Sequence, residues 1–129
     1  MATGFPAATG DILTASMFNG LTTFTIGADN TTDYTAVLSD QYQVLEIMNK
    51  ATAIAFKIPT NASVAFPIGT AITVLNRGVG TCTISAVTSG TTSVLSAGAV
   101  ASAPTLGQYK TAVCIKVATD TWIVTGAIG

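Results

Sequence analysis

Hydrophobic and polar residues alternate most regularly along the central part of the chain, residues 52–86. Ile54, Phe56 and Ile58 share one parity, and Pro59 then ends the run. Strict alternation is typical of a β-strand with two unlike faces. Proline has no N–H group to donate to a β-ladder, so it is expected where a strand ends. The pattern predicts two or three strands joined by tight turns in this stretch.

Similar patterns predict further strands on both sides of the centre. The expected segments are residues 22–26, 34–38, 43–49, 91–96, 108–118 and 121–127. Loops are expected at residues 27–32 and 97–107, and the last two strands are expected to form a hairpin. About eight to ten short strands, with a turn signal roughly every ten residues, predict an all-β fold. The expected architecture is an antiparallel β-sandwich or a barrel-like domain.

Two of these segments place an ionisable residue on an otherwise apolar face. In residues 43–49, Glu46 lies between Val44 and Met48, so this face is expected to be either wet or paired with a polar partner. In residues 108–118, one face carries Val113, Ile115 and Val117, and the other carries Ala112, Cys114 and Lys116.

The length of 129 residues suits one domain with its own core. We expect a single β-domain at residues 11–129, preceded by an extended N-terminal arm at residues 1–10. The arm contains two glycines, one proline and no charged residue. It is either a floppy terminus or a segment that lies on a neighbouring subunit, with Phe5 as its anchor. One short helix is expected at residues 15–19.

Charged residues make up 9% of the chain and the net charge is −1, whereas ordinary soluble domains contain about 25% charged residues. Two explanations compete. The first is a stable β-domain with a threonine-rich surface. The second, which we favour, is that much of the surface is buried against other copies or a larger assembly, because several strands are apolar on both faces.

Residues that carry enzyme chemistry are scarce. The chain has no histidine, which removes the usual general base and the commonest metal ligand. Asp29 and Asp33 are close in sequence, but their spacing matches no calcium loop. Asp40 and Asp120 are most simply turn residues that accept bonds from nearby backbone N–H groups. No catalytic, cofactor or metal site is therefore expected, and the protein is not expected to be an enzyme.

Other partner classes find little support in the sequence. The five basic residues form no patch for nucleic acid, and neither a signal peptide nor a membrane-spanning apolar segment is visible. Cys82 and Cys114 are expected to be reduced and buried. Four aromatic residues are candidates for a sugar-binding groove, although core or interface positions are favoured for them: Tyr34, Tyr42, Tyr109 and Trp122.

Three phrases of the sequence resemble small virion proteins of tailed bacteriophages. The opening GDILTASMFNGL resembles a phrase that precedes a short helix in such proteins. The middle, FKIPTNASVAFPIGTAITVLNRGVGTCTISA, resembles a β-module of phage head, fibre and tail-associated proteins. The ending, LGQYKTAVCIKVATDTWIVTGAIG, resembles the closing hairpin of that module.

The resemblance implies a structural role without catalysis or cofactors, as a homo-oligomer, often a trimer. The short single-module chain suits a capsid decoration (cement) protein, made in the bacterial cytoplasm and bound to the outer surface of the head. Its partner would be the major capsid protein. The alternative is a receptor- or glycan-binding module of a head fibre, tail fibre or tail tip. Phe5 and Pro6 are expected to contact the partner, and Ile47 and Ile123 are expected to lie at subunit contacts.

Overall fold

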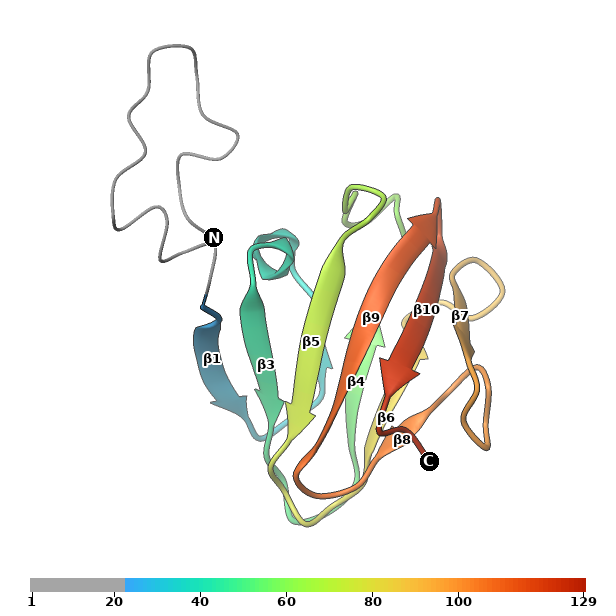
Figure 1. Ribbon diagram of the computed structural model, residues 1–129. Coiled ribbons are helices and arrows are strands. Elements are labelled where there is room, and N and C mark those ends of the chain that lie inside the picture. Colours follow the sequence, from blue (N-terminus) through green and yellow to red (C-terminus); the bar gives the residue numbers. More distant parts are fainter. Residues whose placement is uncertain (1–22) are drawn as a thin grey trace, which may run out of the picture.

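The computed structural model describes residues 23–129, which form ten strands and one short 3-10 helix in two sheets (Figure 1). The larger sheet contains β1 (Thr25–Asn30), β3 (Val44–Met48), β5 (Ala71–Asn76), β9 (Lys110–Ala118), β10 (Thr121–Gly126) and β7 (Ser93–Ser96), in that order. The smaller sheet contains β2 (Tyr34–Thr35), β4 (Ile54–Ile58), β6 (Cys82–Ala86) and β8 (Thr105–Leu106). The all-β prediction is confirmed.

The expected antiparallel arrangement needs correction, because both sheets are mixed. From β1 to β6 the chain alternates between the larger and the smaller sheet. In the larger sheet, β1 pairs in parallel with β3, and β3 pairs in parallel with β5. In the smaller sheet, β2 pairs in parallel with β4, and β4 pairs in parallel with β6. This half of the domain is therefore three turns of a flattened parallel solenoid. Each connection from β1 to β6 joins strands of opposite sheets, so turn signals in the sequence gave no indication of the pairing direction.

The second half of the chain closes the domain with antiparallel pairs. Strand β9 pairs antiparallel with both β5 and β10, so the predicted C-terminal hairpin is present. Strand β8 pairs antiparallel with β6, inside the segment that was expected to be a loop. Strand β7 lies at the far edge of the larger sheet and pairs in parallel with β10.

The two sheets face each other across one apolar core. Alternate residues of each strand point inward, as the parity pattern predicted: Ile54, Phe56 and Ile58 of β4 are all buried. Trp122 packs edge-on against Phe66, with 5.5 Å between ring centroids. Lys116 is also buried, and its Nζ donates to Asn61 Oδ1 at 2.6 Å and to the Phe66 carbonyl at 2.8 Å. The lysine thereby fixes the β4–β5 connection onto the core.

Several predicted element boundaries are corrected. The loop expected at residues 27–32 is largely the second half of β1, and the strand expected at 34–38 is reduced to β2. A 3-10 helix, η1 (Leu38–Gln41), follows it. The expected arm at residues 1–10 and the expected helix at 15–19 lie outside the described residues.

Candidate interaction surface

The outer face of the six-stranded sheet, which points away from the smaller sheet, is mostly apolar. Successive side chains of a strand point to opposite faces of the sheet. Ile72 and Val74 of β5 are fully buried between the sheets, so Thr73 and Leu75 must point outward. The strand register then carries the assignment across the sheet, because residues in register share a face. One row runs Ile26, Leu45, Thr73, Val113, Thr125, and another runs Ala71, Ile115, Ile123, Leu95.

Apolar side chains on this outer face are open to solvent over a large part of their surface. Exposed fractions are 64% for Ile26, 49% for Leu95, 44% for Val117 and 37% for Ile123. Residues of the central strands on this face, such as Leu45, Val113 and Ile115, are half-buried by their neighbours. Residues 23–129 supply two sheets and no third layer above this one. A contiguous apolar face of this kind usually marks an interaction site.

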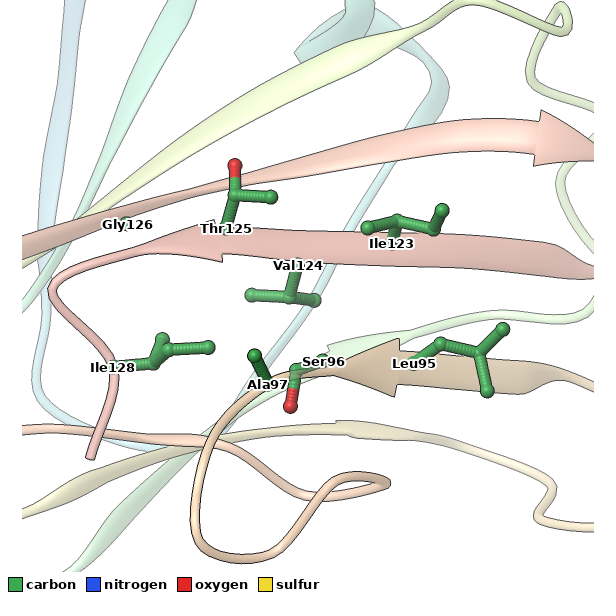
Figure 2. Close-up of a pocket in the computed structure, with 8 residues that line it drawn as sticks. All are labelled: Leu95, Ser96, Ala97, Ile123, Val124, Thr125, Gly126 and Ile128. Carbon is green, nitrogen blue, oxygen red and sulfur yellow. The ribbon is translucent and has the colours of Figure 1, made fainter.

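A hollow lies beside β10 and β7, at one end of this face (Figure 2). Its volume is about 540 Å³. The lining residues are Leu95, Ser96, Ala97, Ile123, Val124, Thr125, Gly126 and Ile128. None of them is charged. Pairing between β7 and β10 ends at Ser96 and Val124, so the last two residues of β10 have no β7 partner.

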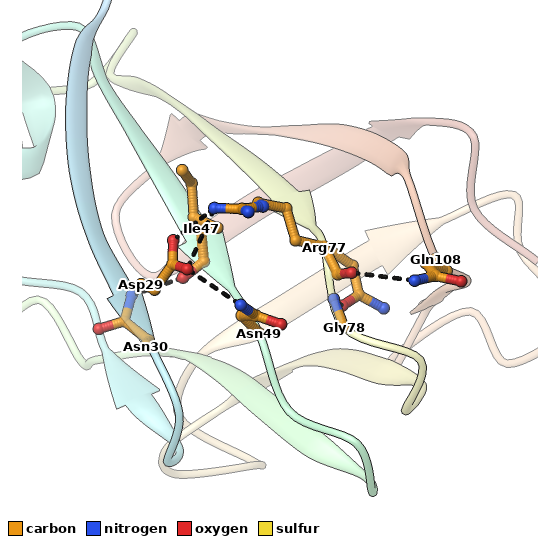
Figure 3. A network of polar contacts seen from close by, with 8 residues as sticks. Asp29, Asn30, Ile47, Asn49, Arg77, Gly78 and Gln108 are labelled. Carbon is orange, nitrogen blue, oxygen red and sulfur yellow. Dashed lines mark hydrogen bonds and ion pairs between the residues drawn. The ribbon is translucent and has the colours of Figure 1, made fainter.

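At the opposite part of the sheet, an ion pair covers the outer face. The Arg77 guanidinium contacts both carboxylate oxygens of Asp29 at 3.1 Å, and Asn49 Nδ2 donates to Asp29 Oδ2 at 2.9 Å (Figure 3). Ile47 lies beside this pair and is only 5% exposed, although its register places it on the outer face. The polar network leaves little of Ile47 free to meet a partner.

The structure therefore separates the four predicted contact residues, of which Phe5 and Pro6 were expected at the partner and Ile47 and Ile123 at subunit contacts. Ile123 lies on the outer face and lines the hollow. Ile47 lies on the same face but is buried, whereas Phe5 and Pro6 lie outside the described residues. Sequence analysis missed Leu95, which is adjacent to Ile123 through the β7–β10 register. The signal available in the sequence was that each is the one apolar residue on the outward face of its strand: Leu95 shares that face with Ser93, and Ile123 shares it with Thr121 and Thr125.

A buried polar cluster lies on the inner side of β3. The Tyr34 hydroxyl donates to Asp40 Oδ2 at 2.8 Å and lies 3.3 Å from Glu46 Oε1, and Asp40 Oδ2 also accepts from the Val37 N–H. Asn30 Nδ2 donates to Glu46 Oε2 at 3.3 Å. Glu46 is thus paired, which was one of its two expected states. Burial, reinforced by Asp40, raises the pKa of Glu46 to about 7. Burial also raises the pKa of Tyr34.

The two aspartates considered for calcium binding and the two cysteines interact with other parts of the same chain or are buried in it. Asp29 pairs with Arg77, and Asp33 accepts from the Ala55 N–H at 2.9 Å. Residues 23–129 contain no group of three or more potential metal ligands. Cys82 and Cys114 are both free and fully buried, as expected, and burial raises the pKa of their thiols to about 11 and about 12.

The aromatic residues do not form one exposed platform. Trp122 is buried in the core, and Tyr34 is stacked on Phe56 with 5.9 Å between ring centroids. Only Tyr42 and Tyr109 of the four are exposed. Tyr34 and Trp122 therefore belong to the core, which the sequence favoured over a sugar-binding groove.

No protein-family model, curated protein or solved structure matches this chain. Within residues 23–129 no helix is both long and apolar enough to cross a membrane.

Proposed function

We propose that this protein is a structural virion protein of a tailed phage, a cement protein that binds the outside of the head and stabilises the lattice of the major capsid protein. The observation that carries the proposal is the apolar outer face of the six-stranded sheet, with Leu95, Val117 and Ile123 exposed. It accompanies the low charge of the chain and the resemblance of three sequence phrases to phage virion proteins.

The mechanism is mechanical and relies on avidity. In a homotrimer, three identical footprints bind the capsid surface together, and a footprint that detaches is held close to its site by the other two. A modest contact per subunit then suffices to hold neighbouring capsid subunits against the pressure of packaged DNA. The apolar outer face contributes because burying it against a partner removes hydrocarbon from water.

The test is a binding experiment with purified phage heads that lack this protein. Purified full-length chain should bind at a saturating stoichiometry of hundreds of copies per head, counted by quantitative gel analysis and cryo-microscopy. About a dozen copies, located at the tail or at fibres, would contradict the cement role and favour a receptor-binding module.

A matched pair of variants tests the outer face itself. Leu95→Ser changes this face. Val87→Ser changes the residue that directly follows β6, a strand of the smaller sheet. Both side chains are 49% exposed, so the two substitutions remove similar exposed apolar surface. Leu95→Ser should weaken occupancy of the heads by roughly ten-fold, about the loss of one buried aliphatic side chain, while Val87→Ser should bind like the unaltered chain. Equal binding by both variants would exclude the outer face as the interface.

A further inference from the structure

The hollow beside β10 and β7 has the properties of a receptor for an uncharged, extended segment. Its eight lining residues carry no charge, and four of them are branched aliphatic residues: Leu95, Ile123, Val124 and Ile128. Its volume of about 540 Å³ lies within the range of ordinary ligand pockets, about 300–1,000 Å³. Because β10 continues past the end of β7, the backbone of Thr125 and Gly126 also borders the open side.

The chain itself contains a segment of matching chemistry. Residues 1–22 include one charged residue, Asp11, and the aromatic residues Phe5 and Phe18. Residues 1–10 have no charged side chain, so the part of the segment around Phe5 can enter an uncharged hollow without the cost of burying an ionised side chain. The seventeen residues between Phe5 and Thr23 span about 60 Å when extended, so the connection is long enough to reach a neighbouring molecule.

The placement of the two elements allows a neighbour as well as the same molecule, and the homo-oligomer of the proposed function favours the neighbour. Residue 23 leads directly into β1, which is one edge strand of the larger sheet, and the hollow lies near the opposite edge. An arm leaving one edge and a receptor at the other edge form a head-to-tail contact between copies. Contacts of this type close into rings when the rotation per subunit allows it, which is the symmetry of the trimer in the proposed function.

We propose that the N-terminal segment of one copy docks in the hollow beside β10 and β7 of the next copy through the few residues around Phe5, with Phe5 seated against Ile123 and Ile128. This inference rests on the homo-oligomer of the proposed function and names its contact. The docked segment covers part of the apolar outer face and links each subunit to the next.

Disulfide trapping between two full-length variants tests the contact directly. One variant carries Phe5→Cys and the other carries Ile123→Cys, and they are mixed under mild oxidation. The native cysteines are fully buried, so they do not compete for cross-linking in the folded chain. We expect a covalent dimer of one copy of each variant, at a yield roughly ten-fold above that of a control mixture in which Val87→Cys replaces Ile123→Cys. Equal yields would overturn the proposal.

The same reagents separate a neighbour from the same molecule. A single chain carrying both Phe5→Cys and Ile123→Cys should give cross-linked oligomers. Cross-linking only within one chain would overturn docking between copies. Full-length Phe5→Asp should associate roughly 10- to 100-fold more weakly than the unaltered chain in light scattering after size exclusion, the effect of losing one buried aromatic side chain. A Phe5→Leu variant, which keeps an apolar side chain, should retain most of the association.

Failure of this inference is distinguishable from failure of the proposed function. If trapping fails while full-length chain still saturates phage heads, the arm contact is wrong and the cement role stands. If trapping succeeds and heads are not decorated, the subunit contact stands and the cement role is wrong.

Discussion

In the buried polar cluster, the single hydroxyl group of Tyr34 is a hydrogen-bond donor to two carboxyl groups, those of Asp40 and Glu46. A tyrosine hydroxyl carries a single proton, and its 2.8 Å bond to Asp40 uses that proton. Glu46 Oε1 accepts from the same hydroxyl at 3.3 Å, so the two carboxyl groups compete for one donor. Burial is the main cause of the raised pKa of Glu46, and the nearby Asp40 carboxyl raises it further, whereas the hydrogen bonds from Asn30 and Tyr34 lower it.

Glu46 should make the stability of the protein depend on pH. Its pKa is about 7 in the folded chain and 4.5 in the ordinary state of the group. Between these values the folded chain holds a proton that the unfolded chain has lost, so the free energy of unfolding should fall as pH rises from about 4.5 to about 7. Glu46→Gln, which cannot titrate, should flatten this slope. Urea unfolding at a series of pH values measures it.

Asp29→Asn provides the control for this experiment, because it also removes one carboxylate but lies in the exposed pair with Arg77. The control should retain the slope between pH 4.5 and 7. If Glu46→Gln and the unaltered chain show the same slope, proton binding at Glu46 does not contribute to stability.

At the scale of elements, the sequence predicted strands more reliably than their pairing. Alternation identified β4 and its buried parity, since parity follows from local geometry alone. Pairing depends on which sheet a strand joins, and β1 to β6 alternate between two sheets. A short turn between strands of opposite sheets has the same composition as a hairpin turn, so parallel pairing was not predictable from turn residues.

The turn between β5 and β6 illustrates how tightly the solenoid turns pack. The Gly80 N–H donates to the Lys50 carbonyl at 2.9 Å, which places Gly80 directly against the β3–β4 connection. A Cβ atom at Gly80 would overlap the Thr52 carbonyl group. Only glycine fits between these two connections without moving the backbone.

Gly80→Ala should therefore destabilise the protein by about 3 kcal/mol, at the upper end of the usual cost of overpacking a core. Chemical denaturation of the purified variant measures the change. Gly107→Ala serves as the control, because a Cβ there would meet nothing closer than Lys110 Cδ at 3.7 Å, and its effect should stay within about 1 kcal/mol. A Gly80→Ala variant as stable as Gly107→Ala would contradict the close packing.

At the scale of the whole molecule, the two-sided apolar strands were visible in the sequence, but which side faces the core was not. In β9 the core side carries Ala112, Cys114 and Lys116, whereas the outer side carries branched residues such as Val113 and Ile115. Ala112 and Cys114 are small, whereas Lys116 lies opposite Trp122 in register and its Nζ donates to the carbonyl of Phe66, the residue on which Trp122 packs. The choice of side was therefore decided by packing between sheets, which no single-strand pattern contains. The hollow beside β10 likewise combines residues of β7, β10 and the chain end.

An oligomer linked through the uncharged hollow should respond to salt as an apolar contact does. Residues 23–129 contain one ion pair, Arg77–Asp29, within a single chain, and the exposed side chains of the hollow are uncharged. Raising NaCl from about 0.1 M to about 1 M shortens the screening length from about 10 Å to about 3 Å, which weakens charged contacts but leaves hydrocarbon burial intact. The oligomer should therefore keep its mass across this range in sedimentation equilibrium. Dissociation at high salt would show that charges hold the subunits together, and the hollow would then lose its assigned role as the subunit contact.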